Sequence, residues 1–326
     1  MPSPSSSLAT LRPDLGGSLQ EFDLAMDRAG FIATRALPVF EVAVKSGVFG
    51  RIPVEQLLQN RDTTRAPRSG YSRSNYTFTS DSFACQEYGA EEPVDDAEAT
   101  MYRNYFDIEM ISAQRAFDAV LRDAERRVSA LLFNSTTWTG SDLTLGITNE
   151  WDDYTNATPI DDVEAAVRKI YANSGLWANA LIINRLVFRN LRNCAKVIDR
   201  ITSSGAGNPA KPSDVTTDML ARVFDLPYII VAGGTENSAD EGQAFAGAPL
   251  WSNEYAMVAK VATGNDISEP CLGRTFHWGA DGSSIGGTVE SYRDETVRGD
   301  VIRVRHDVQE KVLYTECGFL LSNITT

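Results

Sequence analysis

The chain has 326 residues, a formal net charge of −14 and an apolar content of 43%. This length is enough to bury a large core and predicts more than one structural unit. The acid excess excludes bulk attraction to nucleic acid as the mode of action, although a local surface can still face a polyanion. The apolar runs are only as long as strands, and the first residues lack the pattern of a signal peptide, so neither a membrane span nor secretion is predicted.

Cysteine and histidine usage gives little support for metal or nucleophile chemistry. The four cysteines show no CxxC spacing and are predicted to be reduced, buried thiols of a cytosolic product: Cys85, Cys194, Cys271 and Cys317. The two histidines, His277 and His306, each lie in a strand-like run. They are expected to be ordinary strand residues rather than catalytic bases.

Residues 1–48 are expected to form an arm, because they contain too little apolar sequence for a core of their own. A weak helical pattern runs from Gln20 to Leu37 and a strand could start at Val39. Residues 49–92 are predicted to be an extended hairpin, which is marginal in water and must therefore rest on a neighbour. Its strands are expected around a long polar stretch, at Arg51–Val54 and Tyr76–Thr79.

The two halves of this hairpin region differ in charge. Residues 51–80 carry five arginines against two acids, whereas residues 81–98 carry seven acids and no base. A basic finger beside an acidic root favours docking between subunits, and two solvated charge runs are the alternative. The residues predicted to form the inter-subunit contact are Arg61, Arg65, Arg68, Arg73, Glu91, Glu92, Asp95 and Asp96.

The segment Asp95–Phe133 is predicted to be one long helix, around which the other parts are arranged. It contains no glycine or proline, and its apolar residues recur at steps of three and four. Asp95 or Asp96 can cap its start. At 1.5 Å per residue the helix would be roughly 55 Å long. The apolar positions follow the 3.6-residue period of a straight helix rather than a strict seven-residue repeat, which favours an extended, flattened subunit over a coiled coil.

The next part, 160–263, alternates between helical and strand patterns and predicts a sheet covered by helices. Its strands are expected at Ala180–Ile183, Tyr228–Val231 and Glu254–Val261. Its helices are expected from a cap at Asp161 or Asp162 to Gly175, in one piece across Val187–Ile198, and from a cap at Thr216 or Thr217. The segment Gly233–Pro249 is expected to be a loop. From Cys271 onward the chain reads as β structure, with strands at Thr288–Tyr292, Val301–Val308 and Lys311–Glu316.

One stretch, Gly282-Ser-Ser284-Ile-Gly286, matches the GxSxG pattern of serine hydrolases. A nucleophile elbow requires a strand before the serine and a helix after it, followed by an acid and a histidine. Here a β-like run follows, and His306 is the only histidine downstream. The stretch is therefore interpreted as a glycine-rich turn. No paired carboxylates have the spacing of a calcium loop, so the chain is predicted to be no enzyme and to need no cofactor or metal.

The order of arm, basic finger, acidic root, long helix, inserted α/β unit and β tail resembles the major capsid protein of tailed phages, which has the Hong Kong 97 fold. The resemblance covers nearly the whole chain. Stretches that also look like phage capsid sequences are Arg65-Ala-Pro-Arg-Ser-Gly-Tyr71, Glu91-Glu-Pro-Val-Asp-Asp96 and Ala180-Leu-Ile-Ile-Asn-Arg-Leu-Val-Phe-Arg-Asn-Leu191.

The resemblance implies an α+β fold in which residues 1–48 are the N-terminal arm and 49–92 the extended loop that lies over an adjacent subunit. Residues 93–159 would contain the spine helix and the first part of the peripheral domain. Residues 160–263 would be the axial domain and 264–311 the β part of the peripheral domain. Residues 312–326 would be a C-terminal strand, with a return to the axial domain as one option. The partners implied are further copies in pentamers and hexamers, portal, scaffold and decoration proteins, and enclosed double-stranded DNA.

The expected function is therefore that of a virion shell protein, assembled in the host cytoplasm. Some relatives cross-link their subunits through a loop lysine, but residues 46–168 contain no lysine, so a non-covalent shell is predicted. Two alternatives stay open. The first is an encapsulin-type shell, which shares the fold and encloses a protein cargo. The second, of another class, is a soluble hydrolase that uses Ser284.

Overall fold

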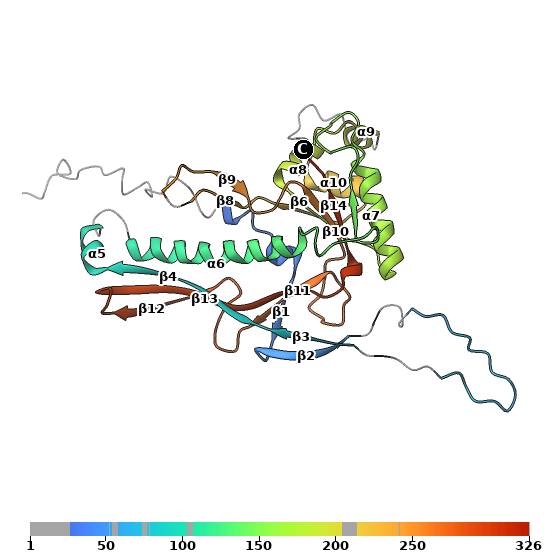
Figure 1. The fold of residues 1–326 in the computed structure, drawn as a ribbon, viewed down its shortest axis with the longest axis horizontal. Helices are drawn as coiled ribbons and strands as arrows, with labels where there is room; N and C mark the ends of the chain where they lie inside the picture. The colour runs from blue at the N-terminus through green and yellow to red at the C-terminus, as the bar shows by residue number, and fades with distance from the viewer. Residues whose placement is uncertain are drawn as a thin grey trace, which may run out of the picture.

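The structure is a computed structural model that describes residues 27–51, 53, 58–73, 77, 79–102, 107–203, 214–240 and 242–325. Figure 1 shows two structural units linked by one long helix, with a loop that extends away from both. The first unit consists of that helix and a sheet of long strands. The second unit lies beside it and consists of another sheet with helices packed on it.

The first unit is built on β13 (Gly299–Val312), a strand of 14 residues. β4 (Gln86–Asp95) and β12 (Thr288–Asp294) pair with it on either side, and β11 (Gly273–Trp278) pairs with its last part. β1 (Val39–Val42) adds to β11 in parallel orientation. Segments from the beginning, middle and end of the chain therefore share one sheet.

The long helix is α6 (Ile108–Leu132), and a short helix, α5 (Asp96–Tyr102), precedes it. The prediction of a single helix over Asp95–Phe133 is therefore wrong. Asp107 has extended backbone angles, and its carboxylate accepts a hydrogen bond from the backbone N–H of Met110 (3.2 Å). This cap starts a new helix at Ile108. With 25 residues, α6 is about 37 Å long.

α6 contributes to both units. Val120 belongs to the same buried cluster as Val304 of β13, whereas Val128, about two turns later, belongs to the cluster that contains Ile182 of the second sheet. These positions confirm the second half of the predicted apolar face. Nearer its start the prediction is wrong at Met110, which is 59% exposed, and Phe106 of the predicted face lies outside the described residues. The helix therefore joins the two cores through its last three turns.

The second sheet has the strand order β5-β14-β10-β6-β7 and combines parallel and antiparallel pairs. The strands predicted at 180–183 and 228–231 are confirmed: the first lies inside this sheet and is fully buried, and the second pairs with it as the edge strand. The five strands are β5 (Thr144–Gly146), β14 (Gly318–Ser322), β10 (Tyr255–Ala259), β6 (Ala180–Asn184) and β7 (Tyr228–Ala232). A short 3-10 turn, η3 (Thr315–Cys317), precedes β14.

Four helices cover one face of this sheet: α7 (Pro159–Ser174), α8 (Arg185–Leu191), α9 (Ala195–Ser203) and α10 (Thr217–Phe224). The opposite face packs against the end of α6 and the arm. Gly175 ends α7 in the left-handed conformation (φ 71) and Thr216 caps α10, as predicted. The predicted cap of α7 is wrong: Pro159 begins the helix earlier, and Asp162 accepts a hydrogen bond from Trp151 Nε1 (3.0 Å) instead.

Three other expectations about boundaries are wrong. The helix expected across 187–198 is two helices, because the backbone turns where Asn193 donates to the Asn190 carbonyl (2.9 Å). The expected loop at 233–249 contains a small hairpin of β8 (Thr235–Asn237) and β9 (Gly247–Pro249). The strand expected at 301–308 continues to Val312, because β11 keeps these residues paired, whereas the strand expected at 311–316 is wrong beyond Val312, since Thr315 already begins a 3-10 turn.

The remaining described residues form the arm and the base of the finger. α3 (Ala33–Ala36) and β1 belong to the arm, and the strand predicted at Val39 is confirmed. The rest of the predicted arm helix up to residue 26 lies outside the described residues. β2 (Ser46–Arg51) and β3 (Thr79–Ala84) pair antiparallel, so the finger has a β base. Of the strands predicted at 51–54 and 76–79, Arg51 lies in β2 and Thr79 in β3, whereas Ile52, Val54, Tyr76 and Phe78 lie outside the described residues.

Candidate assembly surfaces

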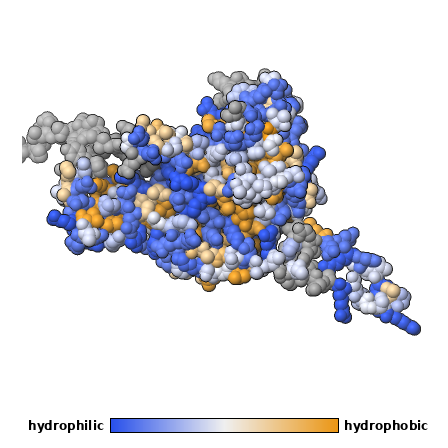
Figure 2. All heavy atoms as spheres, in the orientation of Figure 1, coloured by the Kyte–Doolittle hydropathy of each residue, from blue (hydrophilic) through white to orange (hydrophobic). Residues whose placement is uncertain are grey.

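The finger is a projecting loop, here defined as residues 58–73, beyond the β2–β3 base (Figure 1). It contains no helix or strand among the residues that the structure describes. Its tip is a turn in which Ser69 N donates to the Ala66 carbonyl (3.1 Å) and Arg65 Nε donates to the Ser69 carbonyl (2.7 Å). Arg65 also stacks on Tyr71, which is 74% exposed. Arg65, Arg68 and Arg73 are exposed, and Arg61 is half-buried. Figure 2 shows the loop as a mainly hydrophilic projection at the lower right.

The acidic residues lie at the other end of the first unit. Glu91, Glu92 and Asp95 are in β4, and Asp96 begins α5. In Figure 1 these elements end on the left, whereas the projecting loop leaves on the right. The structure therefore does not bring the two predicted charge groups together within one chain.

The acidic residues have partners that the sequence did not indicate. Arg303 donates to Glu91 (2.6 Å), Arg115 lies 3.7 Å from Glu92, and Arg293 binds both carboxylate oxygens of Asp96 (2.6 Å each). Asp95 accepts from the backbone N–H of Ala97 and so caps α5. The hydrogen bond from Arg293 lowers the pKa of Asp96. The three arginines come from α6, β12 and β13, which are far from the acids in sequence and lie beside them only in the folded chain.

The acidic surface also includes residues outside the predicted set. The β12–β13 turn lies beside α5, where Asp96 N donates to the Arg298 carbonyl (3.2 Å) and Arg293 reaches Glu295 (3.5 Å). We call this end of the molecule the acidic end. Besides Glu91 and Glu92 with their arginines, the segments 95–102 and 293–300 contribute six acids and two bases to it: Asp95, Asp96, Glu98, Asp294, Glu295, Asp300, Arg293 and Arg298.

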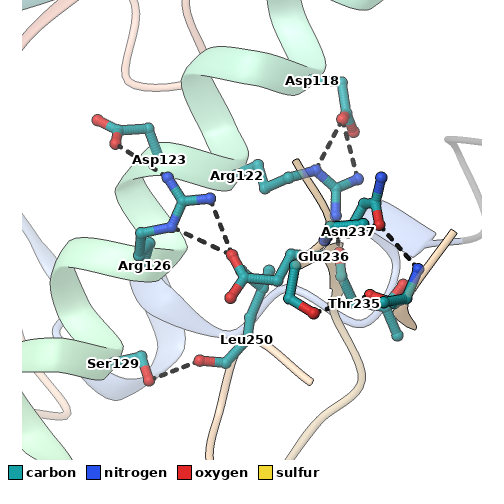
Figure 3. Close-up of polar contacts among 12 residues, drawn as sticks. Asp118, Arg122, Asp123, Arg126, Ser129, Thr235, Glu236, Asn237 and Leu250 are labelled. Atoms are coloured by element: carbon teal, nitrogen blue, oxygen red, sulfur yellow. Dashed lines mark hydrogen bonds and ion pairs between the residues drawn. The ribbon is translucent and has the colours of Figure 1, made fainter. Parts of the chain in front are cut away.

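A separate cluster fixes the β8–β9 hairpin and the arm to α6 (Figure 3). Arg122 binds Asp118 of its own helix, Asp27 of the arm (both 2.9 Å) and the carbonyl of Thr235. Burial lowers the pKa of Arg122, but the hydrogen bonds that it donates to Asp118 and Asp27 outweigh burial and raise the pKa overall. Further along, Arg126 binds Glu236 (2.8 Å) and Ser129 Oγ donates to Leu250 O (2.8 Å).

Glu125 is the buried centre of the same region. It is 2% exposed, and its two oxygens accept hydrogen bonds from Ala33 N of the arm and from Trp251 Nε1 (2.7 Å) of the second unit. Burial of the charge raises the pKa of Glu125. This side chain connects arm, helix and second unit. The sequence shows it only as one of several charged residues in the helix, because its donors lie about a hundred residues away on either side.

Comparison with solved structures identifies this architecture. A phage-related protein from Bordetella bronchiseptica RB50 superposes with a TM-score of 0.64 and 19% identity over 92% of this chain and 96% of that one. The fold is that of phage capsid subunits. The mature capsid of bacteriophage PhiM1 matches with a TM-score of 0.54 and 12% identity, over 87% and 85% of the two chains. The holo-SrpI encapsulin complex from Synechococcus elongatus matches with a TM-score of 0.52 and 10% identity, over 98% and 94%.

The capsid fold, the Hong Kong 97 fold, is thus established by structure and not by sequence. No protein-family model matches the sequence, and neither does any curated protein sequence. The predicted α+β capsid fold is confirmed. No helix among the described residues has the length and apolar character needed to cross a membrane.

Within this capsid fold, Ser284 has no hydrolase geometry. It is exposed in the connection between β11 and β12, and a strand rather than a helix follows it. His306 is buried in β13 and its Nδ1 is paired with the Ile285 carbonyl (3.1 Å). The four cysteines are free and buried, as predicted. In the described part of the chain, no cluster of three or more His, Cys, Asp and Glu side chains could hold a metal ion.

Proposed function

We propose that this chain is the major capsid protein of a tailed phage and forms the icosahedral shell around double-stranded DNA. The observation that carries the proposal is the projecting loop, residues 58–73, which leaves the body of a capsid fold without a core of its own. Such a segment gains stability by lying on another molecule. Copies in pentamers and hexamers provide that surface. Portal, scaffold and decoration proteins, assembly in the host cytoplasm and a place in the virion belong to the same proposal.

The proposed division of the chain follows from the capsid fold. Residues 1–48 are the arm, 49–92 the extended loop, 93–159 and 264–311 the peripheral domain, and 160–263 the axial domain. Residues 312–326 return to the axial domain, which is supported by the pairing of β14 with β10 and β5.

Contact between copies is proposed to join the basic loop of one subunit to the acidic end of the next. A loop at one end and a complementary surface at the other give a head-to-tail contact, which forms a closed ring when the rotation between neighbouring copies divides a full turn. Glu91, Glu92 and Asp96 already pair with arginines of their own chain. Glu98 and Glu295 are exposed at the same end, Glu295 to 84%, and extend the acidic surface available to a second copy.

The test is charge reversal in the loop. Changing Arg65, Arg68 and Arg73 to Glu is expected to lower the yield of particles roughly tenfold or more, because each close charge pair at an interface contributes one to several kcal/mol. Folding of the subunit is expected to be unchanged, since all three side chains are exposed. Particles are counted by negative-stain microscopy and sedimentation, and folding is followed by circular dichroism.

A matched control reverses three exposed arginines elsewhere: Arg168, Arg189 and Arg200. A second variant set adds Glu98→Arg and Glu295→Arg to the loop reversal and is expected to restore particles in part. An unchanged yield in the loop variant, or an equal loss in the control, would contradict the proposed contact. The shell is also proposed to be non-covalent, so denatured particles should give only single chains of 35.7 kDa.

An encapsulin-type shell is the second candidate, because the Synechococcus elongatus encapsulin matches nearly as well as the phage capsid does. The two functions differ in what the particle contains. Nuclease-protected double-stranded DNA in purified particles supports the phage head. A single co-purifying protein cargo without DNA supports the encapsulin.

A further inference from the structure

Two large aromatic side chains at the end of α7 stack on each other while both are largely exposed. Trp177 is 62% exposed and Tyr171 47%, and their rings stack with centroids 4.5 Å apart at an interplanar angle of 23°. Of the other tryptophans, Trp278 is half-buried and three are at most 1% exposed: Trp138, Trp151 and Trp251. Exposed, pre-stacked aromatic rings offer a large apolar area at little cost in conformational entropy, which is typical of binding surfaces.

The stacked pair is continuous with the base of the projecting loop. Leu58, the residue at which the described part of the loop begins, is 65% exposed and lies against Gly175 at the end of α7. A Cβ placed on Gly175 would be only 2.6 Å from Leu58 Cδ1. Leu58, Tyr171 and Trp177 therefore border one surface, which we call the α7 patch.

A polar cleft lies next to the α7 patch. It has a volume of about 320 Å³ and is formed between the β2–β3 base and the end of α7. Its lining includes charged and polar side chains from both units, namely Arg51, Asp81, Asn173, Tyr314 and Glu316. An apolar centre flanked by polar groups is the usual composition of an interface between proteins.

We propose that the α7 patch is a self-assembly contact that a second copy of this chain covers. The inference rests on the proposed function, because the copy on which the projecting loop lies must pass the base of that loop, where the patch is. In Figure 1 the lower end of α7 faces the β2–β3 base, so loop and patch flank the same side of the molecule. Apolar contact at the base would then complement the charge contact made by the loop's arginines.

Quenching of tryptophan fluorescence by acrylamide tests the coverage directly. In unassembled chains Trp177 is expected to account for most of the quenchable emission, because the other four tryptophans are buried or half-buried. The contribution of Trp177 is obtained by subtracting the signal of a Trp177→Phe variant. In assembled particles this contribution is expected to lose most of its quenching. If Trp177 remains as open to acrylamide in particles as in free chains, the patch is not a contact between copies.

Variants test whether the contact matters for assembly. Trp177→Ala and Tyr171→Ala are expected to raise the chain concentration needed for assembly roughly tenfold or more, as for a central aromatic residue of an interface. Trp177→Phe should retain most of the assembly. The matched control is Phe245→Ala, which removes an even more exposed ring (76%) from the segment between β8 and β9.

Each outcome separates this inference from the proposed function. If Trp177→Ala chains form particles as readily as wild-type chains do, the α7 contact is overturned and the shell function stands. The same holds if Phe245→Ala chains show the same assembly defect as Trp177→Ala chains. A wild-type chain that forms no particles under any assembly condition overturns the shell function, and the inference falls with it.

Discussion

The second unit and the projecting loop differ in how far their residues are buried by their own chain. Every residue of β6 is buried, with helices on one face of its sheet and α6 on the other. In the loop, by contrast, every described residue of 58–73 except Arg61 is exposed. The first segment is stabilised by its own chain, whereas the second finds no burial there.

This difference teaches that folding and assembly depend on separate residues. Changes in the second unit should alter the free energy of unfolding of the single chain. Changes in the loop should leave that quantity unchanged and alter only the association of copies. The following predictions test how sharp this separation is.

The largest effect is expected in the second sheet. Leu181→Ala removes a fully buried side chain from β6 and should lower the free energy of unfolding by about 2–5 kcal/mol. Its counterpart in the loop, Tyr71→Ala, should change it by less than about 0.5 kcal/mol, because Tyr71 is 74% exposed. Urea denaturation of unassembled chains measures both. Similar losses in the two variants would show that the loop packs on its own body.

A smaller loss is expected where arm, helix and second unit meet. Glu125→Ala removes the acceptor for Trp251 Nε1 and Ala33 N, and leaves both donors without that partner. Each buried donor left unsatisfied costs about 1–3 kcal/mol. The free energy of unfolding should fall accordingly in denaturant titrations. The exposed Glu164→Ala on α7 is the control and should stay within about 0.5 kcal/mol of the wild type. A neutral Glu125→Ala variant would mean that this junction does not stabilise the chain.

The contribution of Glu125 should also depend on pH. Burial raises its pKa above the ordinary value of 4.5, so the folded chain keeps this proton at pH values where the unfolded chain has released it. The resulting stabilisation is complete below pH 4.5 and is lost as the pH rises through the raised pKa. The difference in free energy of unfolding between wild type and Glu125→Ala should therefore grow as the pH falls from neutral. A difference that shrinks with falling pH would contradict this sign.

The smallest effect is expected where the two regions touch. Gly175→Ala places a Cβ at φ 71 and 2.6 Å from Leu58 Cδ1. The left-handed conformation costs a residue with a Cβ roughly 1–2 kcal/mol, whereas an exposed Leu58 can move aside. The matched variant Leu58→Ala should relieve the contact and leave only the backbone cost. If Gly175→Ala costs nothing, α7 must end differently.

Local patterns predicted those parts of the fold that local chemistry determines. The apolar runs at Ala180 and Tyr228 gave buried strands, and Gly175 gave the end of a helix, because each signal lies within a few residues. The break before Ile108 was missed, since Asp107 acts through its side chain on the next turn and reads otherwise as one more polar helix residue. The hairpin of β8 and β9 was missed because its stability comes from α6, through Arg122 and Arg126.

The candidate surfaces were predictable in part. The basic residues of the loop and the acids of β4 could be found because their charges cluster in sequence. The pairing of the acids within the chain was not visible, since Arg303 reaches Glu91 through the pairing of β4 with β13, and Arg293 reaches Asp96 only because β12 pairs with the same strand. The α7 patch was missed for a related reason. Tyr171 and Trp177 resemble core residues by type, and only the structure shows that nothing in the described chain covers them.

The second sheet cannot be completed until the last strand of the chain, β14, has been synthesised. This strand lies inside its sheet, between β10 and β5, yet it follows all the other strands of both sheets along the chain. A nascent polypeptide interrupted anywhere before Gly318 would therefore leave β10 with an open edge. Such fragments could not complete this sheet, so in the proposed shell only chains translated to the end could fold and assemble.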